Sequence, residues 1–530
     1  MKQDNTTITH AIARFAFLFF FILLPMGASS QASFTIRWQK CLGGSHDETP
    51  GAVFPLDDGF FVFGETYSDD GDVSGFHGKP FYFKTTHGIT MNSPDVWALK
   101  LDLGGNIIWQ KCLGGTDGER FHFGEIASDG TCLAVLETSS KDGNLGIVPE
   151  DRKIAFVFLG PNGEIRMCHL FGGTNGETPF GFFQNSSGEF TIIGNTFSND
   201  GDVVNAHGNQ DIWIFTFDHA GKILYQSCIG GTRNDFVFRF KKCPLGGAFL
   251  LGNTDSFDYD MFQETGWWLY SKLWGTSLER KYLDYYGELP IPEVPWVMRL
   301  DQYGKTVWFK VFSRKDEYSF QDIAPTSDGG VVIVGNGRSW ELEKVIEPPF
   351  LMKLSASGKM EWKKSLGIDE SDLIFDVIET LDKDFLVCGK TSGRKGIFPE
   401  YHGNDDAMVI KLSSTGEVQW KKCFGGSKSD QASSLYQTEK GRFFILGSSD
   451  SNDGDTSGNH GKGDAWLLEL DEKGAILRQR LFGGSGFDTL NSLVKSKDGS
   501  YLLLGYTRSK DGDVQGLHGS FYDIWIVSVK

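Results

Sequence analysis

WKKCFGGSKSDQASSLYQTEKGRFFILGSSDSNDGDTSGNHGKGDAWLLELDEKGAIL, residues 420–477, is the unit that the rest of the chain repeats. The next copy begins at Arg478 and runs to the C-terminus. The position of Trp420 recurs at intervals of 71, 58, 58, 83, 54, 58 and 58 residues, as Trp38, Trp109, Met167, Tyr225, Trp308, Trp362, Trp420 and Arg478. A fixed period of this length is the signature of a repeat architecture.

Each unit contains the pattern of four short strands. In the first copy we expect strands over 50–55, 60–66, 96–102 and 107–113. Asp58-Gly59 and Gly104-Gly105-Asn106 supply the hairpin turns, because glycine and asparagine accept the positive φ that reverses a chain tightly. The third strands read VWALKL, IWIFTF, AWLLEL and IWIVSV, which are nearly continuous apolar runs. Sheets that are covered on both faces have this pattern.

Four-stranded sheets that stack face to face around an axis form a β-propeller. Eight copies of the Trp position predict eight blades. The repeats begin with a fourth strand, FTIRWQKCL from Phe34, and end with a third strand, DIWIVSV at 523–529. We therefore predict an all-β, eight-bladed β-propeller of four-stranded antiparallel blades, whose N-terminal strand completes the last blade and closes the ring.

The units resemble the β-propeller repeats of exported bacterial proteins, in which a GGS-x-x-D turn precedes the first strand and D-x-W-x-x-K-L-D-x-x-G-x-x-x-W forms the outer hairpin. The matching residues of the first copy are Gly43, Gly44, Ser45, Asp95, Trp97, Lys100, Asp102, Gly105 and Trp109. The resemblance covers residues 34–530. It implies an exported or surface-associated protein of the kind found in Bacteroidetes-like bacteria, and it implies no particular activity.

Residues 1–32 do not belong to the repeat. A polar start with Lys2 and Arg14 precedes the apolar run AFLFFFILL at 16–24, and Pro25 and small residues follow. The run is too short to cross a bilayer stably, so the pattern predicts a signal peptide cleaved after Ala28 or Ala32. The alternative is an uncleaved anchor. The propeller of residues 33–530 would then be periplasmic, cell-surface or extracellular, with no membrane span after cleavage.

Charge and cysteine content limit the class of protein. A net charge of −18 and a pI near 5.1 argue against nucleic acid as a partner, because nucleic acid requires a basic face. A glycan or a protein is still a possible partner. We expect the protein to be a monomer. Of eight cysteines, Cys41, Cys112, Cys228 and Cys423 occupy one repeated position in different copies. Equivalent positions of different blades are too far apart to bridge, so we expect small buried thiols.

An acidic residue stands ten positions after each Trp position and opens each innermost strand. We expect these residues to ring the mouth of the central channel: Glu48, Glu119, Glu177, Asp235, Asp372, Asp430 and Asp488, with Glu317 nearest in the shorter fifth copy. One interpretation is that each carboxylate accepts N–H groups of the neighbouring Gly-Gly turn and locks blade to blade. The other is a mouth that attracts cations and binds Ca²⁺. No other cofactor is predicted.

The loop S-x-D-G-D-V-x-G-x-H-G recurs at 68–78, 198–208, 451–461 and 509–519, with a remnant at 140–146. Its histidines, together with that of a related loop, are His77, His207, His460, His518 and His402. The alternating aspartates resemble calcium loops, but the twelve-residue calcium pattern is not met. Recurrence in several blades favours a structural loop whose aspartates cap turns. One metal ion per loop is the alternative.

Two inserts break the repeat, one of about 25 residues at 255–296 and a smaller one at 79–94. The larger insert holds the residues that we predict to contact a ligand: Trp267, Trp268, Tyr270, Trp274, Tyr285 and Tyr286. Aromatic rings on a rim stack on sugar faces or anchor a partner protein. The alternative is a small core that secures the insert over the ring.

No nucleophile elbow, phosphate loop, Cys-x-x-Cys pair or H-E-x-x-H motif occurs, and no catalytic residue is predicted. The sequence favours a non-enzymatic exported propeller that binds a glycan or protein through its loop-rich face. One alternative is a carbohydrate-active hydrolase or lyase that uses carboxylates at the channel mouth. Another is a structural envelope protein.

Overall fold

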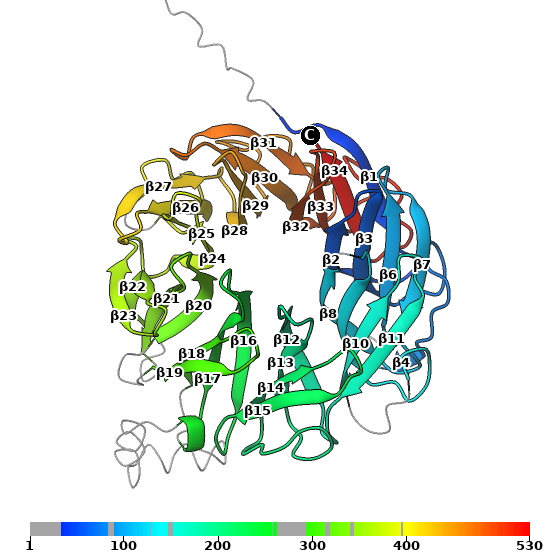
Figure 1. Cartoon of the computed structure of the whole chain (residues 1–530). Coiled ribbons are helices and arrows are strands. Elements are labelled where there is room, and N and C mark those ends of the chain that lie inside the picture. Colours follow the sequence, from blue (N-terminus) through cyan, green and yellow to red (C-terminus); the bar gives the residue numbers. More distant parts are fainter. Residues whose placement is uncertain are drawn as a thin grey trace, which may run out of the picture.

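The computed structural model describes residues 33–82, 90–127, 129–146, 152–256, 258–261, 293–312, 318–339, 344–393 and 396–530. Within these ranges, eight four-stranded antiparallel sheets stand around a central opening like blades (Figure 1). The predicted eight-bladed β-propeller is therefore confirmed. The described helical content is the single 3₁₀ turn η1 (Tyr259–Met261).

The strands follow the chain from the centre of each blade outward. Blades one to four consist of β2 (Glu48–Pro55), β3 (Gly59–Thr66), β6 (Asp95–Asp102) and β7 (Ile107–Leu113); β8 (Glu119–Ile126), β9 (Cys132–Thr138), β10 (Lys153–Leu159) and β11 (Ile165–Phe171); β12 (Glu177–Gln184), β13 (Phe190–Thr196), β14 (Asp211–Phe217) and β15 (Ile223–Ile229); and β16 (Asp235–Lys242), β17 (Ala248–Thr254), β18 (Val294–Leu300) and β19 (Thr306–Val311). Within the smaller insert, β4 (Pro80–Tyr82) and β5 (Thr90–Asn92) form a short hairpin that the sequence pattern did not indicate.

The second half of the ring repeats this order. Blades five to eight consist of β20 (Tyr318–Pro325), β21 (Val331–Ser339), β22 (Lys344–Leu354) and β23 (Met360–Ser365); β24 (Leu373–Glu379), β25 (Phe385–Thr391), β26 (Asp406–Leu412) and β27 (Val418–Phe424); β28 (Asp430–Gln437), β29 (Phe443–Ser449), β30 (Asp464–Leu470) and β31 (Ile476–Phe482); and β32 (Asp488–Lys495), β33 (Tyr501–Thr507), β34 (Asp523–Val529) and β1 (Ile36–Leu42).

The N-terminal strand closes the ring, as predicted. β1 pairs with β34 from Ile36↔Val529 to Leu42↔Ile524, so the first described strand is the outer strand of the last blade. Thr35 and Lys530 exchange backbone hydrogen bonds of 3.3 and 3.1 Å just beyond this pairing. The closure leaves no unpaired edge on β34.

The core lies between the blades, which explains the continuous apolar third strands. Every residue of β14 is buried. Trp213 packs toward blade two, in a cluster that includes Phe156, whereas Ile212 packs toward blade four, in a cluster that includes Leu250. Since successive side chains enter different interfaces, both faces of the strand must be apolar.

The recurring Trp position also joins neighbouring blades. Trp38, on the outer strand of blade eight, donates a hydrogen bond of 2.9 Å from Nε1 to the carbonyl of Leu103 in blade one. Its ring lies so close to Gly105 that an added Cβ there would be 2.5 Å from it, and Gly105 has φ of +79°. The hairpin glycine and the tryptophan are therefore required together.

The innermost strands line the central opening: β2, β8, β12, β16, β20, β24, β28 and β32 (Figure 1). Each contains a bulge at the same place, such as the register shift between Pro50 and Ala52 in β2. Such a bulge reverses which side chains face the neighbouring blades. No helix in the described ranges, which leave out residues 1–32, has the length and apolar character needed to cross a membrane.

Candidate functional site

The predicted acidic residues begin the innermost strands, but their side chains are buried rather than open to the channel mouth. The seven that the structure describes are at most 1% exposed: Glu48, Glu119, Glu177, Asp235, Asp372, Asp430 and Asp488. Glu317 lies outside the described residues. In that blade, Tyr318 occupies the position in the strand register that is equivalent to the acidic residue of the other blades.

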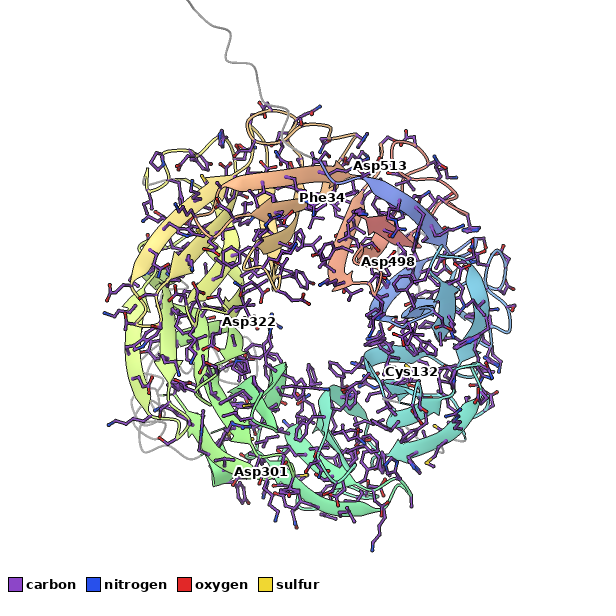
Figure 2. The ribbon with its side chains drawn as sticks, turned by 45° about the horizontal axis from the view of Figure 1, so that its top comes forward. Phe34, Cys132, Asp301, Asp322, Asp498 and Asp513 are labelled. Atoms are coloured by element: carbon purple, nitrogen blue, oxygen red, sulfur yellow. The ribbon has the colours of Figure 1, made fainter. Side chains whose placement is uncertain are left out.

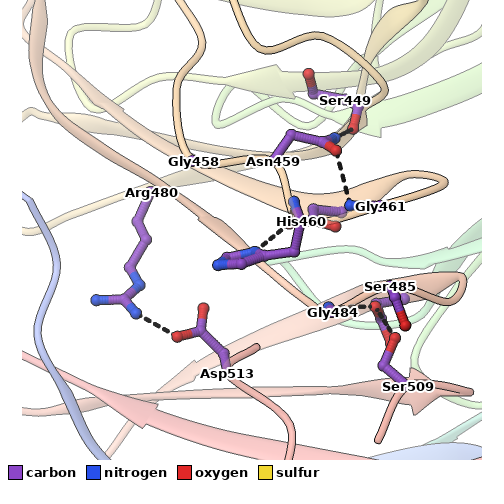
Figure 3. A network of polar contacts seen from close by, with 12 residues as sticks. Ser449, Gly458, Asn459, His460, Gly461, Arg480, Gly484, Ser485, Ser509 and Asp513 are labelled. Carbon is purple, nitrogen blue, oxygen red and sulfur yellow. Dashed lines mark hydrogen bonds and ion pairs between the residues drawn. The ribbon is translucent and has the colours of Figure 1, made fainter. Parts of the chain in front are cut away.

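These carboxylates bind the Gly-Gly turn that enters each blade. Asp488 Oδ2 accepts hydrogen bonds from Gly484 N at 2.8 Å and from Ser509 Oγ at 2.7 Å, and Thr507 donates to Oδ1. The donors Gly484 and Ser509 are labelled in Figure 3. The second glycine of a turn donates in the same way to five more acids, namely Gly44 to Glu48, Gly115 to Glu119, Gly173 to Glu177, Gly231 to Asp235 and Gly426 to Asp430. The acids thus join the last strand of one blade to the first strand of the next.

The S-x-D-G-D loop completes this junction. Asp511 Oδ1 accepts a hydrogen bond of 2.6 Å from Ser485 N, and Asp513 N donates to the carbonyl of Gly483 at 2.8 Å. Gly512 has φ of +67°, and a Cβ on it would lie 2.4 Å from that carbonyl oxygen. The aspartates and glycine of the motif therefore hold a turn, in agreement with the structural interpretation of the loop.

The loop histidines bind a second set of buried aspartates, at the start of the third strands. His460, labelled in Figure 3, has its Nδ1 2.7 Å from Asp464 Oδ2, and its backbone N–H donates to the same oxygen at 3.0 Å. The equivalent pairs are His77 with Asp95, His207 with Asp211, His402 with Asp406 and His518 with Asp523. In four of the five pairs, the ring nitrogen and the backbone N–H of the histidine both contact the aspartate. His207 Nδ1 is 3.7 Å from Asp211 Oδ2 and makes no hydrogen bond, so His207 binds Asp211 through its backbone N–H alone.

Two buried carboxyl groups meet at five of the blade junctions. A Cβ on Gly114 would lie 2.1 Å from Glu119 Oε2 and 3.1 Å from Asp95 Oδ1, so both oxygens approach one glycine Cα. The same geometry pairs Glu48 with Asp523, Asp235 with Asp211, Asp430 with Asp406 and Asp488 with Asp464. In every pair the Oδ1 atom of the third-strand aspartate is buried without a hydrogen-bond partner.

The two negative charges of such a pair repel each other, which adds to the cost of burying either one. Burial raises the pKa of Glu48 and of Glu119 to about 7, the negative partner adds to the rise, and hydrogen bonds from nearby donors oppose it. Burial likewise raises the pKa of Asp235 to about 6 and raises that of Asp95.

We expect the protein to lose stability as the pH rises from 5 to 7.5. The folded pKa values of Glu48 and Glu119 lie above the ordinary 4.5, so the folded chain holds protons that the unfolded chain has released. The stabilisation is complete below pH 4.5 and is lost as the pH rises through about 7. For Glu48 and Glu119 together, the free energy of unfolding should fall by about 5 kcal/mol, measured by urea unfolding across the pH range.

Asp95→Asn provides the matched test. It removes the negative charge of Asp95 that raises the pKa of Glu119, so the pH slope should become shallower. Asp129→Asn is the control, because Asp129 caps an exposed turn and its pKa is lowered rather than raised. An unchanged slope in Asp95→Asn would contradict the repulsion between Asp95 and Glu119 at this junction.

A charged cluster lies on the channel wall where blades four, five and six meet. Arg239 Nε is 3.4 Å from Asp322 Oδ1, and Lys241 Nζ is 3.4 Å from Asp322 Oδ2 and 3.9 Å from Asp376 Oδ1. Asp376 also accepts backbone hydrogen bonds from Leu435 and from its own neighbour Val377. Asp322 lies on the wall of the central opening (Figure 2).

Asp376 is the strongly perturbed member of this cluster. Burial raises its pKa to about 7; Lys241 opposes the rise and the charge of Asp322 adds to it. These four residues were not predicted from the sequence. For Arg239, Asp322 and Asp376, the available signal was a charge where the other copies carry alanine, phenylalanine, glycine or serine. No such signal marked Lys241.

The aromatic residues predicted to contact a ligand lie outside the described residues: Trp267, Trp268, Tyr270, Trp274, Tyr285 and Tyr286. Trp296, at the end of the insert, is fully buried in β18 and its Nε1 has no hydrogen-bond partner among the described residues. The eight cysteines are all free thiols, seven of them buried. The described ranges contain no group of three or more His, Cys, Asp or Glu side chains arranged to hold a metal ion.

Comparisons with known proteins found distantly similar structures and no matching sequence family. No family model matches the chain, and neither does any curated protein. A quinohemoprotein alcohol dehydrogenase from Pseudomonas putida aligns at TM-score 0.39 and 10% identity, covering 94% of this chain and 76% of that one. A puromycin hydrolase aligns at TM-score 0.39 and 11% identity, covering 90% and 61%. A protein of unknown function from Bacteroides caccae aligns at TM-score 0.27 and 11% identity, covering 60% and 93%.

Proposed function

We propose that the protein is an exported, non-enzymatic β-propeller that binds a glycan or protein partner through its loop-rich face, at blade four. The main observation in support of this proposal is the structural role of the repeated polar residues. The acids, the loop aspartates and the loop histidines hold blade junctions together, as at Asp488, Asp511 and His460. Function is therefore sought where the chain departs from the repeat.

Blade four departs from it most. Its second strand ends at Thr254 and its third begins at Val294, and the connection holds three of the protein's 14 tryptophans in the eight residues 267–274. Such aromatic density supports stacking on sugar rings or anchoring of a protein surface. The described ends of this connection, Thr254 and Val294, are paired at the end of the blade opposite the tight hairpin turns.

Export is the second part of the proposal. It is supported by the signal-peptide pattern of residues 1–32 and by the resemblance to repeats of exported bacterial proteins. The free thiols are compatible with it, because burial raises the pKa of the Cys168 thiol to about 12 and keeps it unreactive. Fractionation of cells, with mass spectrometry of the mature N-terminus, tests this part.

The triple variant Trp267→Ala, Trp268→Ala, Trp274→Ala is expected to lose binding to any ligand found by glycan-array or pull-down screening. The expected loss is at least about tenfold in Kd, because a few aromatic side chains supply most of the binding energy at many interfaces. Thermal unfolding should stay within about 2 °C of the wild type, since the connection lies outside the repeat. Retained binding would refute the role of the insert.

One observation favours a second candidate, a carbohydrate-active hydrolase or lyase. Asp376, with its raised pKa, lies beside Asp322, and two carboxyl groups in different protonation states are what acid–base cleavage of a glycoside requires. Release of reducing ends from polysaccharides by the wild type, abolished in Asp376→Asn, would support this candidate. Equal activity in both proteins would exclude that pair.

A further inference from the structure

Blade eight combines two distant parts of the chain. Its outer strand, β1, continues directly into blade one, whereas β32, β33 and β34 follow blade seven. Blade one is therefore held against these three strands by noncovalent contacts alone. One group of such contacts is the pairing of β1 with β34. A second group lies at the loop-rich end of the junction, where the loop 509–519 of blade eight meets the loop 68–78 of blade one.

His518 faces a carboxylate with each of its two ring nitrogens. Its Nδ1 lies 2.7 Å from Asp523 Oδ2 at the start of β34, and its Nε2 lies 3.5 Å from Asp72 Oδ2 in the loop of blade one. A neutral imidazole carries a proton on only one nitrogen, so the other nitrogen would point a lone pair at a carboxylate. The doubly protonated, positively charged ring is the form that suits both contacts.

The neighbouring junction, between blades seven and eight, is held differently. There the loop aspartate equivalent to Asp72 is Asp513, which pairs with Arg480 at 2.5 Å (Figure 3). The residue of β1 equivalent to Arg480 is Lys40, whose Nζ donates to Asn106 at 3.2 Å instead. Each of the other four loop histidines has a single aspartate as its ion-pair partner within the described part of the chain. At the ring closure, a histidine that can lose its charge therefore takes the place of a permanently charged arginine.

The groups around His518 favour its charged form. Partial burial lowers the pKa of His518, but the hydrogen bond and charge of Asp523, together with the charges of Asp72 and Glu48, raise it by more and leave it above the ordinary 6.5. These three acids lie on β34, on the blade-one loop and on β2, and they are the charged groups that face the histidine among the described residues. The imidazole side chain is 29% exposed, so it exchanges its proton directly with solvent.

We propose that His518 is a pH-sensitive link across the ring closure. Its protonated ring joins Asp523 of blade eight to Asp72 of blade one, and loss of the proton leaves the two loops joined by weaker contacts. Because the folded pKa lies above that of the unfolded chain, the link is complete below pH 6.5 and is lost as the pH rises through the folded value. The two strands of the closure, β1 and β34, then open locally more often.

Hydrogen–deuterium exchange from pH 6 to pH 9, corrected for the intrinsic exchange rate, tests the link. The variant His518→Asn keeps a donor for Asp523 and removes the charge. At pH 6 we expect the protection of β1 and β34 to be about fivefold lower in this variant than in the wild type, as for a partly exposed ion pair. At pH 9 the two proteins should agree. Glu48 titrates over the same range in both proteins, so the comparison cancels its effect.

Two further variants make the test specific. Asp72→Asn removes the second carboxylate and should lower the protection of β1 and β34 at pH 6 by a similar factor. Adding it to His518→Asn should change little more, because both substitutions remove the same contact. His460→Asn is the matched control, since Arg480 holds the loop aspartate at its junction. This control should leave β1 and β34 as protected as in the wild type.

Equal protection of β1 and β34 in His518→Asn and in the wild type at pH 6 would overturn the inference. A deficit of the same size at pH 6 and at pH 9 would also overturn it, because the contact would then be structural and independent of the proton. An equal loss of protection in His460→Asn would show that the effect is not specific to the ring closure. None of these measurements uses a ligand, so their outcome is independent of the proposed binding function.

Discussion

Deletion of residues 33–42 is expected to lower the free energy of unfolding by at least about 5 kcal/mol and to cause association. The deletion removes β1, so the whole length of β34 becomes an exposed edge. It also exposes Trp525, whose Nε1 donates to Gln39 at 2.9 Å, and removes the buried ring of Phe34. Urea unfolding and size-exclusion chromatography would measure the two effects.

A circular permutant is the control for this deletion, because it moves the chain ends but keeps residues 33–42 and their pairing with β34. It begins at Asp58, in an exposed turn of blade one, joins Lys530 to Ser33 by a short glycine-containing turn, and ends at Asp57. Lys530 and Thr35 already exchange backbone hydrogen bonds, so the new turn has little distance to span. We expect stability within about 2 kcal/mol of the wild type. A permutant as unstable as the deletion would contradict closure by β1.

Asp488→Ala is expected to cost about 3 to 5 kcal/mol of the free energy of unfolding, although it removes only a small side chain. Gly484 N, Ser509 Oγ and the Thr507 hydroxyl all lose their acceptor in a site with no water access. Thermal and urea unfolding of the variant would measure the cost. Ligand affinity, measured below the unfolding transition, should not change.

Two controls make this expectation specific to the junction. Asp488→Asn keeps one acceptor oxygen and should cost about half as much. In a double-mutant cycle, Ser509→Ala should be far less costly in the Asp488→Ala background than in the wild type, because the two groups share one hydrogen bond. Wild-type stability together with lost ligand binding in Asp488→Ala would make this acid a binding residue instead of a junction residue.

The repeat was sufficient to predict the architecture from sequence. The period, the apolar third strands and the offset between Phe34 and Val529 together determine blade number and ring closure. The spacing of His460 and Asp464 was also a signal that the two side chains pair, and this contact was not predicted. Both residues recur four positions apart in several copies, within reach of one hydrogen bond.

The direction of side chains on the innermost strands could not be predicted in the same way. Period-two alternation assigns residues to faces only while a strand is regular, and the bulge shifts the alternation by one residue. Glu48 precedes the bulge, and it binds the Gly-Gly turn at the blade junction, as the first interpretation of the acidic residues predicted. Asp322 and Asp376, just beyond the bulge, reach the channel cluster with Lys241, although 54 residues separate them in sequence.

Hydrogen–deuterium exchange with and without a bound ligand is the most direct test of the claim that repeated residues hold the ring and blade four binds. We predict ligand-dependent protection in 233–243 and 255–296, extending to 318–325 and 372–379 if the ligand enters the channel. The junctions of blades seven and eight, around Asp430 and Asp488, should be unchanged. Protection spread evenly over the blades, or concentrated at these junction acids, would contradict the account.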